Sequence, residues 1–371
     1  MGEVLDERND QAPMNNEYPL MAFIANEGVS PKGSRYDRSA LVKDQKNKLY
    51  KKTEFGDFIY SSNNLESGSI GLNKYGKASL SPVYNIFKLR DNSDSGFLGN
   101  RLIREDLINS MIKYRQGVIY GQWRVPVYEF LNIKVLIPIL EEQRKVGAII
   151  EILESLITLE QEKHKKLICL FNQLYTNIFS ERLRDLSKEY SKVKLSDIIF
   201  PHDERAEDNS YPLLSSTLSG IFLQSEYFDN NTASSDIYNY KVVPNGYFTY
   251  RSMSDTGKFK INLQNIVEKG IVSPAYPVFK LSDNVNKVYF EKYIEYCPET
   301  QYKISVAAQG GTRLALPFTK LQDIEIFLHT PEDQENISDL IKLIDKIILL
   351  SENKTLKLQL LKQFLLNNLF I

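Results

Sequence analysis

Basic, amide and aromatic side chains on turn-rich stretches are the groups of this sequence best suited to bind a ligand. Arginine can bridge the edge of a guanine, glutamine can bridge an adenine, and lysine pairs with phosphates, so such a set predicts contact with DNA. Each residue taken alone also fits an ordinary solvated surface, but two corresponding sets occur, one in each half of the chain. The predicted DNA-binding residues are Lys32, Arg35, Tyr36, Arg38, Lys74, Tyr75, Trp123 and Arg124 in the first half, and Tyr227, Arg251, Lys258, Lys260, Gln309, Thr312 and Arg313 in the second.

The residues that catalysis would need do not form recognisable patterns. The sequence has no Gly-x-x-x-x-Gly-Lys-Ser/Thr phosphate loop and no Asn/Asp-Pro-Pro-aromatic segment of the kind that holds a target base in methyltransferases. Its three histidines, His164, His202 and His329, are too dispersed for a Ser/His/Asp arrangement or a histidine metal site. Two cysteines, Cys169 and Cys297, are too few for a disulfide framework, and we expect both to be buried thiols. We therefore expect no catalytic residue, no metal and no cofactor.

The composition is that of a globular protein with balanced charge. The 371 residues, 42.8 kDa in mass, carry 46 Lys and Arg against 47 Asp and Glu, a net charge of −1. This balance argues against a uniformly basic protein that coats nucleic acid, and tight DNA binding would need base recognition or a more basic partner. The N-terminal segment has no apolar stretch of the signal-peptide type, and the longest apolar runs are too short to span a bilayer. We therefore expect a cytoplasmic protein.

A duplicated unit must position the predicted binding residues. Short motifs of the first half recur in the same order about 190 residues later, a shift far beyond the period of solenoid repeats. The chain is therefore expected to contain two large units. The recurring segments include Tyr18 to Leu20 with Tyr211 to Leu213, Ser81 to Tyr84 with Ser273 to Tyr276, Gly121 and Arg124 with Gly310 and Arg313, and Asn177 and Phe179 with Asn368 and Phe370.

Each unit is expected to combine an α+β part with a long helix. Short alternating runs, such as Gly56 to Tyr60 and Ile133 to Ile137, are separated by Gly, Pro and Asn turns, which predicts strands joined by loops. Glu141 to Ser180 and its C-terminal counterpart would each form a rod of roughly 60 Å. The predicted segments are 1–138, a globular domain; 139–185, a long helix; 186–330, a second globular domain; and 331–371, a second long helix.

Apolar residues on both long helices recur at alternating steps of four and three, which indicates a coiled-coil seam. Polar residues interrupt the seam at equivalent places, Glu160 and His164 in the first helix and Ser351 and Thr355 in the second. We expect the helices to pair antiparallel within one chain about a pseudo-twofold axis; a stalk between separate chains is the alternative. The predicted seam and partner-binding residues are Val146, Ile150, Leu153, Ile157, Leu167, Phe171 and Leu174, with Ile337, Ile341, Ile344, Ile348, Leu358 and Leu365.

In this layout the whole chain resembles the specificity subunits of type I restriction–modification systems. The resemblance rests on the duplicated unit, on the segments Ile137 to Gln143 and Thr330 to Gln334, and on the Asn-x-Phe ends of both long helices. The Ser-Pro-x-Tyr segments and the Gly-Gly-Thr-Arg loop, Gly310 to Arg313, also resemble the target recognition domains of that family.

The resemblance implies a non-catalytic subunit in which each globular domain is a target recognition domain for one half of a bipartite double-stranded DNA site. The paired helices would be a ruler that sets the gap between the halves and a docking surface for two methyltransferase subunits, with restriction subunits in the larger complex. Methylation and cleavage would then reside in those partners. The alternatives are the specificity chain of another restriction class, a coiled-coil scaffold with two protein-binding domains and no DNA contact, and a cryptic nuclease or methyltransferase.

Overall fold

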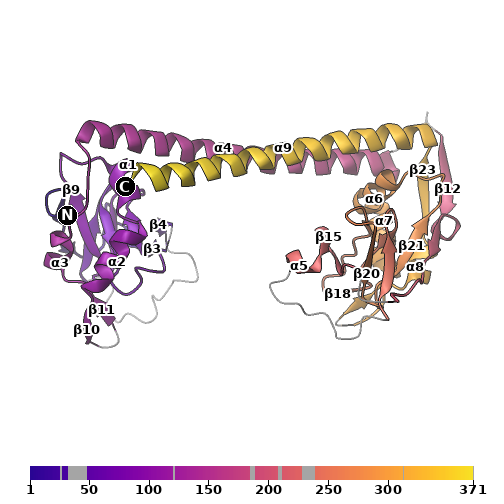
Figure 1. The fold of residues 1–371 in the computed structure, drawn as a ribbon, viewed down its shortest axis with the longest axis horizontal. Coiled ribbons are helices and arrows are strands. Elements are labelled where there is room, and N and C mark those ends of the chain that lie inside the picture. Colours follow the sequence, from indigo (N-terminus) through magenta and orange to yellow (C-terminus); the bar gives the residue numbers. More distant parts are fainter. Residues whose placement is uncertain are drawn as a thin grey trace. The chain divides into compact units, whose positions relative to one another are not determined.

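The chain forms two compact units, of which the first is assembled from two separate parts of the sequence and the second from one continuous segment (Figure 1). The computed structural model describes residues 1–25, 27–31, 48–119, 122–183, 189–207, 211–227, 239–311 and 313–370. Unit 1 contains Met1–Glu160 and Lys354–Ile371, and unit 2 contains Gln161–Asn353. The two long helices, α4 (Leu140–Phe179) and α9 (Pro331–Leu369), therefore each contribute one part to each unit.

Unit 1 is built on an antiparallel four-stranded sheet. Its elements are β1 (Leu5–Glu7), β2 (Gln11–Ala12), β3 (Met21–Ile24), β4 (Gly28–Pro31), β5 (Tyr50–Thr53), β6 (Phe58–Tyr60), β7 (Ile70–Leu72), β8 (Ala78–Leu80), β9 (Asn85–Leu89), α1 (Ser95–Arg101), α2 (Glu105–Lys113), β10 (Gln116–Ile119), β11 (Gln122–Arg124) and α3 (Val127–Asn132). The strand order is β1-β9-β6-β7, and Phe58 lies opposite Phe87. Tyr60 and Phe130 complete a buried aromatic core, in which ring centroids of neighbouring residues lie 4.9–6.4 Å apart.

Because side chains alternate along a strand, the residue between Phe58 and Tyr60 faces the other side of the sheet. Ile59 is fully buried there, and with Ile86 it packs against a second sheet, β2-β5-β8, and the β3–β4 hairpin.

Unit 2 repeats this architecture. Its elements are β12 (Tyr190–Lys194), β13 (Ile199–Pro201), β14 (Leu214–Thr217), β15 (Gly220–Leu223), α5 (Gln224–Tyr227), β16 (Lys241–Pro244), β17 (Phe248–Thr249), β18 (Met253–Ser254), β19 (Asn262–Leu263), β20 (Lys269–Val272), β21 (Val278–Leu281), α6 (Lys287–Tyr296), α7 (Pro298–Ala307), β22 (Leu314–Ala315), α8 (Phe318–Gln322) and β23 (Glu325–His329). The main sheet has the order β13-β21-β17-β19, the counterpart of the unit 1 sheet strand for strand. Phe248 lies opposite Phe279 as Phe58 lies opposite Phe87, which confirms the duplication predicted from the sequence.

In both units a buried glutamine near the start of a long helix attaches that helix to the globular part. The buried Gln143 accepts the backbone N–H of Asp94 at 2.9 Å and donates to the carbonyl of Pro138 at 2.9 Å. The buried Gln334 accepts the backbone N–H of Asn286 at 3.1 Å and donates to the carbonyl five residues before it at 2.8 Å. Asp94 and Asn286 are the N-cap residues of α1 and α6, so each glutamine grips the beginning of the short helix beside it.

A phenylalanine from the end of the other long helix completes each joint. Phe370 packs against Phe97 of α1 with tilted rings at a centroid distance of 5.0 Å, and Phe179 meets Tyr289 of α6 edge-on at 5.5 Å. The joint of unit 1 also depends on Gly147, the single glycine of α4, because a Cβ there would lie 2.4 Å from the Asp94 carboxylate and 2.9 Å from the amide nitrogen of Phe97. These contacts explain the physical role of the recurring glutamine and of the phenylalanine in the Asn-x-Phe motifs.

The two long helices run antiparallel, as predicted. In unit 1, Glu154 pairs with Lys362 at 2.8 Å and Glu160 with Lys354 at 2.7 Å, so positions rise along α4 as they fall along α9. Glu160 is buried and lies on the seam, so the polar interruption is part of the helix pairing rather than a gap in it.

One predicted seam residue lies outside the seam. Leu174 is 37% exposed, and Tyr175 takes the buried position, with 2% of its surface exposed. After Leu167 the buried side follows steps of four, Phe171 and then Tyr175, because a nearly straight helix drifts away from a strict seven-residue repeat. The other twelve predicted seam residues are buried or half-buried.

Two further expectations are wrong. Cys169 lies exposed on the outer side of α4, whereas Cys297 is buried as expected. Ile133 to Ile137 is not a strand, although its unit 2 counterpart, β23, is. β23 pairs with β12 along five residues, whereas none of the described strands of unit 1 lies beside residues 133–137, and a strand needs such a partner to satisfy its backbone groups.

Within the described residues, none of the helices combines the length and the apolarity needed to cross a membrane.

Candidate nucleic-acid interface

The predicted binding residues fall into three groups. Lys32, Arg35, Tyr36, Arg38 and Thr312 lie outside the described residues. Trp123 lies on β11 and Tyr227 at the end of α5, where the structure gives their place in the backbone. The remaining eight, Lys74, Tyr75, Arg124, Arg251, Lys258, Lys260, Gln309 and Arg313, can be followed to the side chain.

Tyr75 stands on a tight turn of unit 1 that a buried asparagine holds. The Asn73 carboxamide accepts the backbone N–H groups of Tyr75 at 2.9 Å and Gly76 at 3.1 Å, and it donates to the Gly76 carbonyl at 2.7 Å and to Thr53 at 3.1 Å. Asn73 is fully buried, whereas 48% of Tyr75 is exposed. The turn therefore presents an aromatic ring on a rigid base, which suits stacking or groove contact.

The neighbouring lysine is tied to the long helix. Lys74 lies 3.5 Å from the carboxylate of Glu154, which also pairs with Lys362. Burial acts to raise the pKa of Glu154, but the hydrogen bond from Lys362 and the charges of both lysines outweigh burial and hold this pKa below its ordinary value. Glu154 thus connects the loop of Lys74 and Tyr75 to both α4 and α9.

Arg124 lies at the end of the β10–β11 hairpin and is exposed. Lys51 is close enough to sense its charge: burial lowers the pKa of Lys51, the charge of Glu7 acts against that change, and the positive charge of Arg124 reinforces it. Lys51, Glu7 and Arg124 therefore lie close to one another in unit 1.

In unit 2 a short ladder brings two predicted loops together. β18 pairs with β22, with Met253 opposite Ala315 and Ser254 opposite Leu314, and Gln309 exchanges both backbone hydrogen bonds with Ala315 at 2.7–2.8 Å. Arg251, Lys258, Gln309 and Arg313 therefore lie on two adjacent loops, and all four are exposed.

An aspartate holds the arginine of this cluster. The Arg313 Nε donates to Asp255 Oδ1 at 2.7 Å, and the side chains are 55% and 59% exposed. That hydrogen bond, together with the charges of Arg313 and Arg251, holds the pKa of Asp255 below its ordinary value. Gly310, at φ +139°, makes the turn possible, because a Cβ there would lie 2.2 Å from the Arg313 carbonyl oxygen.

Lys260 does not join the cluster. It pairs with Glu295 of α6 at 2.9 Å, with 20% of its side chain exposed, between the buried residues Phe259 and Ile261. Its charge is neutralised within unit 2, so Lys260 is not part of the candidate interface.

Two residues that organise these surfaces were missed in the sequence. Asn73 and Asp255 each precede a glycine of positive φ by two or three positions, in Asn-Lys-Tyr-Gly and Asp-Thr-Gly. Such Asx–Gly spacing is a turn signal, and it would have marked both loops as rigid.

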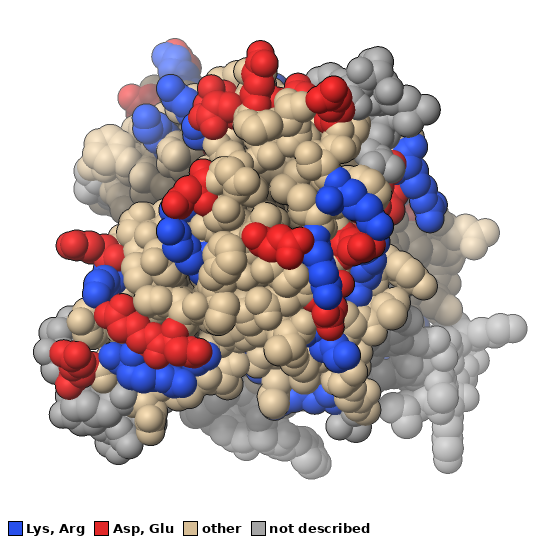
Figure 2. Space-filling view, turned by 90° about the vertical axis from the view of Figure 1, so that its right-hand side faces the viewer, with Lys and Arg blue, Asp and Glu red and all other residues tan. Residues whose placement is uncertain are grey.

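Acidic and basic side chains offset one another on the face of unit 2 that carries β12 and β23. Figure 2 shows acidic and basic side chains intermixed there. Lys192 pairs with Glu325 at 2.7 Å and Lys194 with Asp323 at 2.9 Å. Such neutralised pairs attract phosphates weakly, so this face is a poor candidate for DNA contact.

Within the described parts of the chain, no group of three or more His, Cys, Asp and Glu side chains could hold a metal ion.

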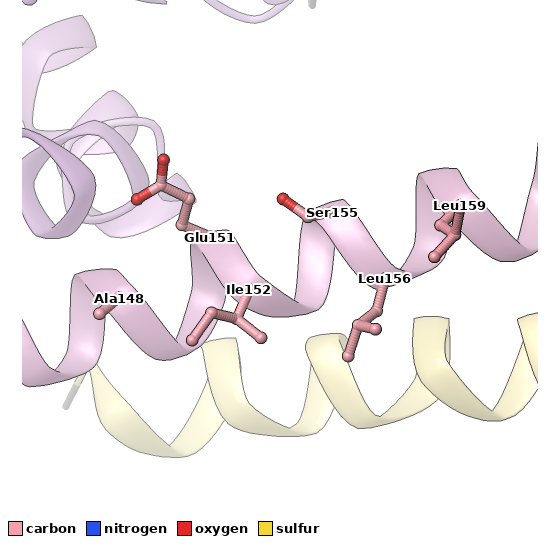
Figure 3. Close-up of a pocket in the computed structure, with 6 residues that line it drawn as sticks. All are labelled: Ala148, Glu151, Ile152, Ser155, Leu156 and Leu159. Carbon is pink, nitrogen blue, oxygen red and sulfur yellow. The ribbon is translucent and has the colours of Figure 1, made fainter.

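The long helices carry a second kind of surface. In unit 1, α4 has a shallow groove of about 400 Å³ lined by Ala148, Glu151, Ile152, Ser155, Leu156 and Leu159 (Figure 3). Ile152 is 60%, Leu156 41% and Leu159 55% exposed. In unit 2, α9 exposes Leu340, Leu343 and Ile347. Exposed apolar residues repeated on one helix are typical of a protein-binding surface.

Residues 10–168 match the family model described as type I restriction modification DNA specificity domain, which covers less than half of the chain. No curated protein matches the chain at a significant level. Three solved structures are similar over all of this chain and 94–96% of their own, and they share its fold. They are the HsdS subunit from Thermoanaerobacter tengcongensis (TM-score 0.54, 18% identity), a chain from a study of complex assembly and conformational transition of the type I R-M system (0.60, 17%), and the S subunit of a type I restriction-modification system from M. genitalium (0.53, 12%).

Proposed function

We propose that this chain, whose residues 10–168 match the model of a type I restriction modification DNA specificity domain, is the subunit that recognises DNA sequence for a type I restriction–modification system. The observation that carries the proposal is the duplication. The sheet of unit 1 recurs strand for strand in unit 2, and the family model covers its strands β6, β7 and β9, which supports two recognition domains of one kind in one chain. A fold shared over the full length with specificity subunits supports the same conclusion.

Each unit reads one half of a bipartite DNA site. The loops that carry Lys74, Tyr75 and Arg124 face one half-site, and those that carry Arg251, Lys258, Gln309 and Arg313 face the other. Their side-chain chemistry differs between the units, which is expected if the two half-sites differ in sequence. The long helices set the gap between the half-sites, because a helix has a fixed rise per residue.

Methyltransferase subunits dock on the exposed apolar surface of α4 and α9. The groove of Figure 3 supports this role in unit 1, and Leu340, Leu343 and Ile347 support it in unit 2. Restriction subunits join the larger complex. The chain itself is non-catalytic, and adenine methylation and DNA cleavage belong to its partners.

The alternative of a coiled-coil scaffold that binds only proteins is not favoured. It leaves the specificity domain of residues 10–168 without a role. It also gives no reason for loops that hold exposed arginine, glutamine and tyrosine side chains on rigid turns in both units.

Methylation mapping tests the proposal. The chain is co-expressed with the methyltransferase subunit of its own system, and methylated adenines are mapped across the genome with and without the chain. We expect one split motif that depends on the chain. A methylation pattern that does not change on deletion of the chain would contradict the proposal.

A further inference from the structure

We propose that Arg313 reads a guanine in the half-site of unit 2 and that Asp255 is the residue that positions it, an inference that rests on the proposed function. The observation is the contact of the Arg313 Nε with Asp255 Oδ1 at 2.7 Å, on two loops that the β18–β22 ladder holds together. Asp255, a carboxylate that would otherwise oppose DNA binding, then serves to orient Arg313.

The contact leaves the end of the guanidinium available. A single bond from Nε holds the side of the group, and within the described part of the chain no hydrogen bond engages its two terminal nitrogens. Those two nitrogens form a planar fork whose spacing matches O6 and N7 of a guanine in the major groove. An arginine gripped at Nε is therefore pre-ordered for this one bidentate contact, and less side-chain entropy is lost on binding.

The ion pair has little value for folding. Both side chains are more than half exposed, and exposed pairs contribute little to the free energy of unfolding. The surrounding backbone is fixed without it, by the hydrogen bonds between Gln309 and Ala315 and by the tight turn at Gly310. A stabilising role therefore does not account for Asp255, whereas orientation of Arg313 does.

A phosphate contact would not call for this geometry. A carboxylate beside a phosphate-binding arginine adds repulsion and cancels the charge that attracts the phosphate. Beside a base-reading arginine the same carboxylate fixes the direction of the fork. The cost in net charge is offset by Arg251, which is close enough to lower the pKa of Asp255, and Lys258 lies on the same loop.

The experiment measures base preference with the whole complex. The chain is assembled with its methyltransferase subunits, and methylation of a DNA library randomised across both half-sites is sequenced. The variants are Arg313→Ala, Arg313→Lys, Asp255→Ala and Asp255→Asn. The control is Asp323→Asn, which breaks an exposed ion pair of the same kind with Lys194 of β12.

We expect Arg313→Ala to reduce the preference for guanine at one position of one half-site by about 5- to 150-fold, the range that one bidentate contact supplies. Arg313→Lys should recover little of this preference because lysine has no fork. Asp255→Ala should weaken the preference at the same position, and Asp255→Asn should weaken it less because its amide oxygen still accepts from Nε. The control and the other half-site should be unchanged.

A modified base separates base reading from other effects. Replacing the implicated guanine by 7-deazaguanine removes N7, so it should impair the wild type and leave Arg313→Ala unaffected. An even loss across all library sequences would assign Arg313 to a phosphate and overturn the inference while leaving the proposed function standing. Asp255 variants with wild-type base preference would overturn the positioning role. A wild type that selects no split motif would contradict the proposed function itself.

Discussion

Asn73 shows how one buried amide can determine the position of an exposed side chain of the candidate interface. Its carboxamide makes three hydrogen bonds within the turn that presents Tyr75 and a fourth to Thr53. We predict that Asn73→Ala lowers the free energy of unfolding of unit 1 by about 1–3 kcal/mol, because buried partners lose their hydrogen bonds. Urea unfolding would measure this change.

Tyr75→Ala is the matched control. The exposed ring contributes little to folding, so the free energy of unfolding should stay within about 0.5 kcal/mol of the wild type. DNA methylation by the assembled complex should fall with both variants. Equal unfolding midpoints for Asn73→Ala and the wild type would contradict the role given to Asn73.

Glu154 makes the link between loop and helices dependent on pH. Its pKa is lower in the folded chain than in the unfolded chain, so the folded state binds fewer protons. Its contribution to stability is therefore complete above the unfolded-state pKa of about 4.3 and is lost as the pH falls through the lower folded-state pKa. We predict that Glu154→Gln destabilises unit 1 at pH 7 and that its deficit shrinks as the pH falls below about 4.

Paired urea titrations of wild type and Glu154→Gln at several pH values would measure that deficit. Glu151→Gln, on the same helix, should behave as the wild type throughout, since among the described residues Glu151 has no ion pair. A deficit of constant size at every pH would show that charge is not the cause.

At the scale of single residues, the sequence predicted which loops carry the candidate binding residues better than it predicted which of those side chains are free to bind. Arg251, Gln309 and Arg313 do gather on neighbouring loops. Lys260 does not, because Glu295, 35 positions later, takes its charge. Residue type and turn context can suggest where cations lie, but the carboxylates that engage them come from distant parts of the chain.

The joint between globular part and long helix is the element on which both units depend. We predict that Gln143→Leu and Gln334→Leu each lower the free energy of unfolding of their own unit by roughly 1–3 kcal/mol, because buried backbone groups lose a partner. Gln363→Leu, which changes an exposed glutamine of α9, should have little effect. Hydrogen exchange resolved along the chain would measure each unit separately, and protection lost equally in both units would contradict independent joints.

The paired helices allow a test of the ruler. Gln161 to Leu167 and Ile347 to Asn353 continue the antiparallel register set by Glu160 and Lys354, so deleting both segments keeps that register. The rods shorten by about 10 Å, which corresponds to roughly three base pairs. We predict a methylated motif whose gap is about three bases shorter and whose half-sites are unchanged. Altered half-site bases would instead assign sequence reading to the helices.

The long helices and the duplication followed from the sequence because their signals repeat. Steps of three and four recur along each helix, and the paired motifs share one shift. What failed depended on neighbours in space. Tyr175 replaced Leu174 because the helix follows its own period of about 3.6 residues rather than a strict heptad. The segment Ile133 to Ile137 has a strand pattern but has no described partner strand.

The whole molecule combines near-neutral charge with exposed apolar helix surface. With 46 basic and 47 acidic residues, and with many of these paired, the chain gains little from general attraction to phosphates. We predict weak DNA binding by the isolated chain, which weakens further as salt is raised. Fluorescence anisotropy at several salt concentrations, with and without methyltransferase subunits, would measure this. Tight binding by the chain alone would contradict the need for a partner.

The joint of Gln143 and Phe370 in unit 1, which Gln334 and Phe179 repeat in unit 2, has a consequence for evolution by recombination. Each joint needs only three groups: the backbone N–H of the N-cap residue, an aromatic ring three positions after that residue, and the carbonyl five residues before the glutamine. None of these requirements involves the loops of the candidate interface. A recombination event that exchanges one globular part for a foreign one of the same kind therefore preserves the attachment. Under the proposed function, such an exchange would change the DNA specificity in one genetic step, without any change to the long helices.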